Sequence, residues 1–259
     1  MIKHQPHLTK SYFLLVIISL LCCAASIRAQ VTTYTDSWGN QGVSLEAENS
    51  ANILINFSIT QFQLDDIDVD GTILKAAHLP GVFLPNNEGA PDLAGLGKYI
   101  ALPQGADATF KIISSRVETI SNVDIAPAPR IPKDTESGPL EYKKNQQLFS
   151  SDRFYPDSPI LLSSKTQMRG VDVVLMGITP FQYNPVKKEL RVYRDLKIEI
   201  SFNGGNGQFG DNRLRSRWWD PILKDALINF NSLPEIDYTN NNISDALDQD
   251  FEYLIITPD

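Results

Sequence analysis

Residues 171–202, VDVVLMGITPFQYNPVKKELRVYRDLKIEISF, contain the clearest secondary-structure signal of the chain. Residues 171–179 form an apolar run, which is typical of a strand covered on both faces. After a turn through Lys187 and Lys188, apolar residues alternate with polar ones from Leu190 to Phe202, the period-two pattern of a strand with one solvated face. We expect these two strands to form an antiparallel hairpin, with a bulge or edge where Arg194 interrupts the apolar face.

The same β pattern extends upstream. Residues 53–59 alternate apolar and polar side chains, and residues 62–69 repeat the alternation up to Asp70-Gly71, a dipeptide favoured in hairpin turns. Residues 99–102 and 108–115 are further strand candidates. Together these segments predict a mainly β fold, an antiparallel β-sandwich or barrel-like domain over residues 30–234.

One amphipathic helix is expected at the C-terminal end of this domain. Asp220 is the predicted N-cap and Pro221 the first helical residue, apolar residues follow at helical spacing up to Phe230, and Pro234 ends the element. Residues 235–250 are polar and read as a linker. Residues 251–259, FEYLIITPD, are typical of the first central strand of a truncated α/β domain, although they could instead pair with the sandwich.

The first 29 residues are predicted to be a signal peptide. Lys3 and Lys10 precede an apolar run over residues 12–25, shorter than the about 20 residues that span a bilayer, and Ala29 is the expected cleavage site. A lipoprotein leader cut before Cys22 or Cys23 is disfavoured, because neither cysteine follows a suitable small residue. After cleavage we expect no stable membrane span.

Composition excludes several function classes for the remaining chain. Without the leader it has no cysteine and a single histidine, His78, and its net charge moves from −8 to −11 because the leader carries three basic residues and no acid. Such acidity disfavours nucleic-acid binding. Nucleophilic triads and most zinc sites need histidine with a partner, so this stretch is predicted to be no enzyme and to hold no metal or cofactor.

Residues 66–71, DIDVDG, match the first half of a calcium-binding loop. Ala77 stands where that loop places its bidentate glutamate, so a polar strand face running into a hairpin turn is the preferred interpretation. Residues 126–134, APAPRIPKD, carry alternate prolines that favour an exposed, stiff, extended loop.

Several short motifs resemble the propeptide of gingipain-family cysteine peptidases. The most specific is GITPFQYNP at residues 177–185, continued by ELRVY at 189–193; weaker matches are LPG at 79–81, GAP at 89–91, ALP at 101–103 and IAPAP at 125–129. The segment YLIIT at 253–257 is similar to the opening strand of that family's caspase-like catalytic domain. The resemblance covers nearly the whole chain after the leader.

The resemblance implies a β-rich domain that helps a cysteine endopeptidase to fold and keeps it latent. The implied partners are the chain's own or a cognate catalytic domain and the export machinery. The implied route is export across the inner membrane to the periplasm and then, by type IX secretion of Bacteroidetes, to the cell surface or medium. The catalytic Cys–His pair and any calcium site would lie in a catalytic domain beyond residue 259.

The resemblance also implies an inhibitory loop that occupies the cleft; in the family's arginine-specific members a basic residue of this loop fills the specificity pocket, whereas other specificities need no basic anchor. Arg130 in the proline-rich loop is the first candidate and Lys133 the second; the alternative is that Arg130 is a solvated surface charge. Arg213, Arg215 and Arg217 precede Trp218-Trp219 and form either a processing site or a basic patch beside the helix.

Two other functions compete with the propeptide hypothesis. One is the leader of a sortase-like peptidase of the type IX route, which has a similar domain plan. The other is a free-standing secreted β-sandwich adhesin or binding module. A binding module usually presents aromatic residues on a strand face, whereas Trp218 and Trp219 lie beside the predicted helix.

Overall fold

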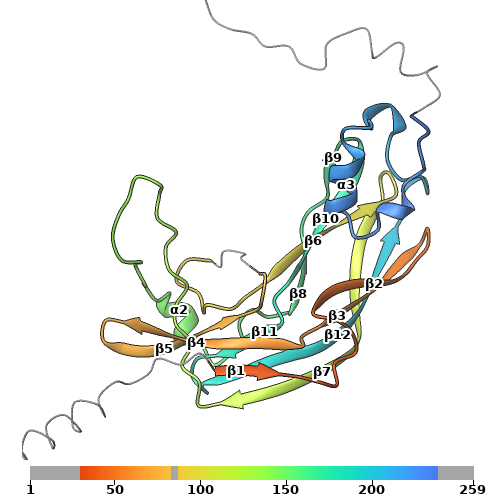
Figure 1. Ribbon diagram of the computed structural model, residues 1–259. Helices are drawn as coiled ribbons and strands as arrows, with labels where there is room; N and C mark the ends of the chain where they lie inside the picture. The colour runs from red at the N-terminus through yellow and green to blue at the C-terminus, as the bar shows by residue number, and fades with distance from the viewer. Residues whose placement is uncertain (1–29, 83–86, 239–259) are drawn as a thin grey trace, which may run out of the picture.

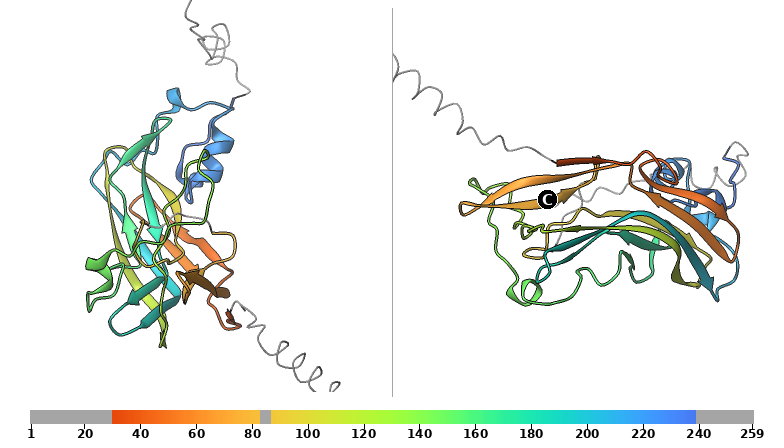
Figure 2. Two further views of the ribbon diagram at one scale, coloured as in Figure 1. Left: turned by 90° about the vertical axis from the view of Figure 1, so that its left-hand side faces the viewer. Right: turned by 90° about the horizontal axis from the view of Figure 1, so that it is seen from below.

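The structure is a computed structural model that describes residues 30–82 and 87–238. The predicted signal peptide with Ala29, and residues 251–259 with most of the linker, lie outside the described residues. The described chain forms three antiparallel sheets (Figure 1). The sheets are layered over a common core and do not close into a barrel, as the two further views in Figure 2 show. The prediction of a mainly β, antiparallel domain is confirmed.

The largest sheet is built around the long strand β12 (Glu189–Asn203). On one side β12 pairs with β11 (Phe181–Asn184) and β3 (Asn52–Ser58), and β3 continues to β2 (Gly42–Glu48). Along its other side β12 pairs with β7 (Asp107–Ser121). The apolar residues predicted on one face of β12 are buried opposite those of β3, because Leu196, Ile198 and Ile200 face Phe57, Ile55 and Ile53 in the register.

A β-bulge interrupts β12 at Arg194, as predicted. The pairing with β7 shifts between Tyr193 and Asp195. The carbonyl of the extra residue Arg194 accepts a hydrogen bond from Ile59 N at 2.7 Å. The extra residue shifts the alternation of inward and outward side chains by one position. Asp195 and its direct neighbour Leu196 are therefore both completely buried.

The expected hairpin between residues 171–179 and 190–202 is wrong. Residues 171–178 form β10 (Val171–Ile178), the centre of a second sheet with β6 (Leu96–Leu102), β8 (Ile160–Leu162) and β9 (Thr166–Met168). The hairpin partner of β12 is β11, reached through the predicted turn, where Lys188 adopts φ 53°. Pro180 lacks a backbone N–H to extend the β10 ladder, and the chain crosses there from one sheet to the other.

The third sheet contains β1 (Gln30–Thr33), β4 (Gln61–Val69) and β5 (Thr72–His78). The predicted turn at Asp70-Gly71 is confirmed, since both residues have positive φ, 52° and 80°, as the favoured two-residue hairpin turn requires. Asp68 Oδ1 accepts a hydrogen bond from Gly71 N, and Asp66 forms an ion pair with Lys75 across the strands. The aspartates therefore belong to a polar strand face.

The apolar core lies between the sheets and draws on all three. Phe62 of β4 contacts Phe181 of β11, with ring centroids 5.5 Å apart, and Phe57 and Tyr183 are buried with them. Burying each such side chain contributes on the order of 2 kcal/mol. Residues predicted as strands from period-two alternation thus supply most of the core.

The C-terminal helix is shorter than predicted. α3 (Asp220–Ala226) has Trp219 at its N-cap, and its C-cap residue Leu227 is already extended. The expected N-cap Asp220 is wrong by one position, because the Asp220 carboxylate accepts hydrogen bonds from Arg215 instead of capping the helix. Phe230 lies in a separate 3-10 helix, η2 (Phe230–Ser232); η1 (Asn212–Leu214) precedes α3, and a short helix α2 (Gln146–Phe149) precedes β8.

The helix ends early because the next residues cover the open edge of β6. Ile228 N donates to the carbonyl of Tyr99 at 2.9 Å. The side-chain amide of Asn229 then pairs with Ala101 like a strand, accepting from its N–H at 2.8 Å and donating to its carbonyl at 3.0 Å. Asn229 is completely buried. None of the helices within residues 30–82 and 87–238 is long and apolar enough to cross a membrane.

Candidate functional site

The proline-rich segment is a buried strap at its start and an exposed loop only further on. Ala126, Pro127 and Ala128 are buried, which corrects the expectation of an exposed segment throughout. The reason is the backbone pairing: Ala126 N donates to Lys75 O of β5 at 2.7 Å, and Ala128 N donates to Ala90 O at 2.7 Å. Pro127 lies between the two donating residues, at a position where no N–H is needed.

Gly89 closes the loop that follows this strap. Its N–H donates to Ala128 O at 2.9 Å, and its carbonyl accepts from Asn145 N at 2.9 Å. Gly89 has φ 76°, and a Cβ there would lie 2.6 Å from the carbonyl oxygen of Lys143, so no other residue fits. The segment between these two bonds, residues 129–144, extends away from the strands in Figure 1; we call it the projecting loop.

Arg130, the first candidate for the inhibitory residue, lies at the base of the projecting loop. Its N–H donates to Glu141 O at 3.0 Å. Its guanidinium forms ion pairs with Glu136 at 2.8 Å and Glu141 at 3.4 Å, and 36% of the side chain remains exposed. Hydrogen bonds to Glu136 and then Glu141 raise the pKa of Arg130, and the bond from Arg130 lowers the pKa of Glu136. The residue is thus a partly exposed cation held between two carboxylates.

Lys133, the second candidate, is exposed at a turn of the same loop. Glu136 N donates to Lys133 O at 2.9 Å, and Lys133 N donates to the Glu136 carboxylate at 3.3 Å. The Glu136 carboxylate therefore both stabilises this turn and pairs with Arg130. Two apolar side chains of the loop, Ile131 and Leu140, are 65% and 47% exposed. A loop that presents apolar and cationic groups on a closed base is suited to contact a partner protein.

The three arginines before α3 differ sharply in their surroundings. Arg213 is 87% exposed and pairs with Asp211 at 2.7 Å, and the guanidinium of Arg217 lies 4.8 Å from the ring centre of Trp218. Arg215 is buried, donating to both oxygens of Asp220 at 2.9 and 2.7 Å and to Pro234 O at 2.6 Å. As folded, Arg215 is a structural residue, so only Arg213 and Arg217 of the three stand exposed to a processing enzyme.

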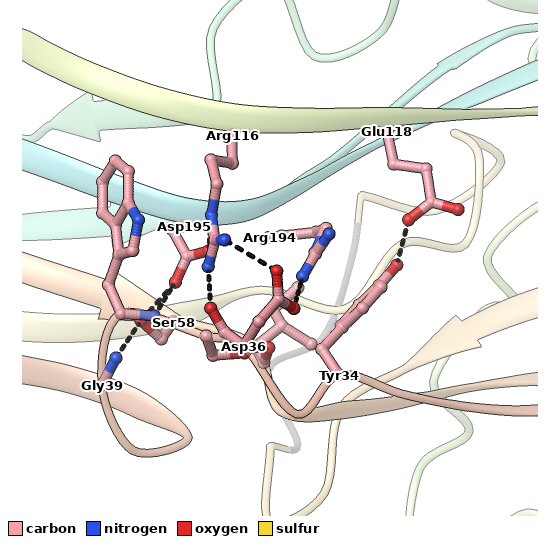
Figure 3. Close-up of polar contacts among 11 residues, drawn as sticks. Tyr34, Asp36, Gly39, Ser58, Arg116, Glu118, Arg194 and Asp195 are labelled. Atoms are coloured by element: carbon pink, nitrogen blue, oxygen red, sulfur yellow. Dashed lines mark hydrogen bonds and ion pairs between the residues drawn. The ribbon is translucent and has the colours of Figure 1, made fainter.

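A polar cluster that carries no sequence motif joins the N-terminal segment to the bulge in β12. The buried Asp195 carboxylate accepts from Ser58 Oγ at 2.6 Å, Trp38 N at 2.8 Å and Arg116 Nε at 2.7 Å. Asp36 pairs with both Arg116 and Arg194 (Figure 3). The one sequence sign of this cluster is the interruption of the apolar pattern at Arg194.

The ionisation of the cluster follows from its contacts. Although desolvation opposes the shift, the hydrogen bond from Arg194 and the charges of Arg194 and Arg116 lower the pKa of Asp36. The Tyr34 hydroxyl donates to Glu118 at 2.8 Å, and burial together with Glu118 raises the pKa of Tyr34 far above its usual range. The guanidinium of Arg194 lies over the Tyr34 ring, 4.0 Å from its centre. These contacts fasten residues 34–38 to the sandwich.

Metal-ligating side chains do not gather in the part of the chain that the structure describes. No cluster of three or more histidine, cysteine, aspartate or glutamate side chains suited to a metal occurs in residues 30–82 and 87–238. An open cavity of about 660 Å³ in this part of the chain is lined mainly by residues 207–213 with Gln104, Ser232 and Pro234. Its lining contains the ion-paired Asp211 and Arg213, side-chain amides and Ser232, without a histidine, cysteine or lysine.

Known proteins similar to this chain include the gingipains. The family model Propeptide_C25 matches residues 35–234. The chain is 24% identical to Lys-gingipain HG66 of Porphyromonas gingivalis over 177 residues, 66% of this chain and 10% of that protein. It is 27% identical to gingipain R2 of P. gingivalis over 159 residues, 59% of this chain and 22% of that protein. The chain thus matches only a small part of the length of these relatives.

Solved structures show the same fold. One, a complex of P. gingivalis RgpB pro- and mature domains, matches with a TM-score of 0.65 at 22% identity, covering 74% of this chain and 98% of that one. A second, on the zymogenic latency of gingipain K from P. gingivalis, has a TM-score of 0.57 at 19% identity and covers 68% and 99% of the two chains. Since the family model spans most of the described residues, this chain belongs to the Propeptide_C25 family and contains a gingipain-family propeptide domain.

Proposed function

We propose that this domain binds the catalytic domain of its own or a cognate gingipain-like cysteine endopeptidase, assists its folding and keeps it latent. The observation that carries the proposal is the projecting loop, residues 129–144, closed at its base by Gly89 within a domain of the propeptide family. A closed loop loses little conformational entropy when it docks. One similar solved structure is a complex of pro- and mature domains, which supports the same kind of partner here.

Within the projecting loop, Arg130 is the proposed anchor in the cleft. Its present partners, Glu136 and Glu141, are carboxylates on the loop itself. A specificity pocket that recognises a basic residue offers a carboxylate of its own, so the guanidinium would stay paired on docking. Glu136 and Glu141 would lose this partner, but their side chains are 38% and 70% exposed and remain solvated. The glutamates would keep Arg130 positioned before binding.

The test is to shorten the loop without disturbing the sandwich. Because Gly89 holds Ala128 and Asn145 beside each other, residues 131–141 can be replaced by a short Gly-Ser link. We expect residues 30–259 carrying this change to fold and to inhibit the mature cognate peptidase far less than the unchanged chain when added in trans. Equal inhibition by both proteins would refute the role of the loop.

A matched pair of substitutions separates contact from nonspecific effects. Ile131→Ser alters an exposed apolar side chain on the projecting loop, and Val186→Ser alters one of similar exposure, 54%, on the β11–β12 turn. Only the first should weaken inhibition. Equal effects of the two would place the contact elsewhere on the domain.

Folding assistance needs a separate measurement. The denatured catalytic domain should regain more activity when refolded with residues 30–259, followed by proteolytic removal of the propeptide, than when refolded alone. Identical recoveries would leave the domain an inhibitor and remove the chaperone role.

Export is the last part of the proposal. The apolar run at residues 12–25 with Lys3 and Lys10 before it supports a signal peptide cut after Ala29, and we propose that the precursor then reaches the cell surface or medium by the type IX route. N-terminal sequencing of the exported protein tests the cut. A sortase-like parent peptidase would be distinguished by its substrate, a carboxyl-terminal sorting domain, while the family match favours either peptidase over a free-standing binding module.

A further inference from the structure

The outer edge of β7 is not paired with another strand. β7 pairs with β12 along one side, and no strand or isolated bridge joins its other side within residues 30–82 and 87–238; Figure 1 shows it in yellow-green at the margin of the sandwich. Every fourth residue from Ala108 to Ile120 is half-buried, and all the others in β7 are exposed. A row of backbone N–H and C=O groups along this edge is therefore open to another strand.

The other sheet edges in the described chain are protected. Ile228 and Asn229 cover the edge of β6, and the edge of β5 bonds to the strap through Lys75. β2 has a register shift between Leu45 and Ala47, and the strands β1, β8, β9 and β11 are only three or four residues long. Covered, bulged and short edges resist pairing with other strands, so β7 is the long edge that the fold leaves available.

The C-terminal half of β7 is regular enough to extend a sheet. The register with β12 shifts at Ile113, and after it residues 114–121 follow one another without an extra residue, because the extra residue of the second shift, Arg194, belongs to β12. β7 contains no proline or glycine, and its two basic and two acidic side chains balance. Such a neutral, proline-free and exposed strand is of the kind that pairs with another chain.

The side chains decide how a second copy would align with this segment. In an antiparallel pair related by a twofold axis, one residue lies directly opposite its own copy. Arg116 or Glu118 in that position would place like charges opposite each other, and a centre at Ser115 would run the pairing across the bulge at Ile113. Val117, which is 46% exposed, brings two apolar side chains together instead.

We propose that two copies of this domain pair antiparallel through the outer edges of β7, over residues 114–120, with Val117 at the twofold axis. In this register Ser115 faces Thr119 of the second copy. Seven residues from each chain make a small and reversible contact. The contact goes beyond the proposed inhibition of a peptidase and uses no residue of the projecting loop.

The pairing leaves the polar cluster around the bulge intact. Arg116 stays bonded to Asp195 and Glu118 to Tyr34, because the new hydrogen bonds come from the backbone of the two strands. The contact therefore adds to the existing side-chain bonds of β7 and replaces none of them.

Disulfide formation tests the register, because residues 30–259 contain no native cysteine. Val117→Cys should form a linked dimer at least about tenfold faster than Ile113→Cys, since residues directly opposite each other have Cβ atoms about 5 Å apart, whereas position 113 would lie about 27 Å from its own copy. The two side chains are almost equally exposed, 46% and 45%. A mixture of Ser115→Cys and Thr119→Cys chains should link as heterodimers.

Two results of this experiment would overturn the proposal. Equal rates for Val117→Cys and Ile113→Cys would mean that the linking is random collision. Faster self-linking of Ser115→Cys than of Val117→Cys would require another register.

Sedimentation equilibrium measures the association itself. The chain of residues 30–259 should dimerise reversibly as its concentration rises, and Val117→Lys should remain monomeric, because a lysine in the middle of an edge blocks pairing. The matched control Val186→Lys, at a side chain 54% exposed on the β11–β12 turn, should dimerise like the unchanged chain. A chain that stays monomeric up to millimolar concentration, or a dimer that Val117→Lys leaves intact, would show the proposal to be wrong.

Hydrogen exchange separates a second copy from another occupant. The outward amides of residues 114–120 should gain protection as the concentration of this chain rises, without any peptidase present. If they gain protection only after the mature peptidase is added, the peptidase is the partner of this edge and the proposal fails.

Discussion

Arg116 on β7 donates from Nε to the carboxylate of Asp195 on β12 at 2.7 Å, and Asp195 is completely buried. A carboxylate without solvent needs such partners, because an unpaired buried charge is strongly destabilising. Ser58 and the backbone of Trp38 supply the others. The bulge at Arg194 creates this requirement, and the N-terminal segment helps to satisfy it.

Removing Arg116 should therefore destabilise the domain. We expect Arg116→Leu to lower the free energy of unfolding in urea by about 3 kcal/mol, because it leaves Asp195 charged and short of a donor. The matched control is Lys197→Leu on β12, which breaks a partly exposed pair with Glu46 of β2 and should cost less than about 1 kcal/mol. Equal losses would show that Asp195 does not need its cation.

The pairing of Asp36 makes the N-terminal attachment sensitive to acid. The pKa of Asp36 is lower in the folded state than its ordinary value, so its contribution is fully present above the unfolded pKa of about 3.9 and is lost as the pH falls through the folded pKa. We expect Asp36→Asn to reduce the fall in stability between neutral pH and about pH 3. Urea midpoints at several pH values measure this, and parallel curves for both proteins would contradict it.

Asn229 should be essential to the edge of β6. Asn229→Ala leaves both the N–H and the carbonyl of Ala101 without their partner in a buried site, at a cost of about 2–4 kcal/mol. Asn206→Ala removes two exposed bonds, one donated to Gln104 and one accepted from Gln208 N, and should cost less, about 1 kcal/mol or below. Hydrogen exchange at Ala101 is the local readout: it should speed up in the first variant only.

Arg130 should contribute to inhibition and little to stability. Arg130→Ala is expected to raise the inhibition constant by about tenfold to a hundredfold, the value of a charge-assisted hydrogen bond, while the unfolding free energy stays nearly constant because the side chain is partly exposed. Arg130→Lys keeps the charge but lacks the planar guanidinium, so its inhibition constant should lie between those of the unchanged domain and Arg130→Ala. Lys133→Ala serves as the neighbouring control. A larger rise of the inhibition constant in this variant would mean that Lys133, and not Arg130, is the anchor.

Trypsin should distinguish the three arginines before α3. Cleavage after Arg213 and Arg217 should precede cleavage after Arg215, because the Arg215 side chain is buried and bonded to Asp220 and Pro234. Mass spectrometry of early digests identifies the bonds. Early cleavage after Arg215 would mean that this region opens readily as a local unit.

The strands could be predicted because their burial pattern is local. In β3 and, away from the bulge, in β12 every second residue is buried, and the Asp70-Gly71 turn depends on two adjacent residues. The sheet to which β10 belongs could not be predicted. The chain crosses between sheets at Pro180, and the partners of β10 depend on tertiary packing that the hydrophobic patterns on either side of Pro180 do not encode. The early end of α3 likewise depends on Asn229 reaching Ala101, which lies 128 residues away in sequence.

The candidate loop was predictable in place but not in detail. Prolines at alternate positions located the strap, yet the burial of Ala126 and Ala128 requires β5 and the Gly89 segment to lie on either side. The pairing of Arg130 with Glu136 and Glu141 follows from the loop folding back on itself. The cluster around the bulge joins strands and loops far apart in sequence, and Asp36 and Arg116 are 80 positions apart. The broken apolar period at Arg194 therefore indicated the bulge but none of its partners.

The closure at Gly89 has a consequence for how specificity can diverge among such propeptides. Both backbone pairings end at Ala128 and Asn145 before the loop begins, so insertions, deletions and new anchor residues between these two points leave the sandwich unchanged. The loop is therefore an interchangeable cassette: grafting residues 129–144 from another propeptide should transfer its preference for a peptidase while keeping this scaffold.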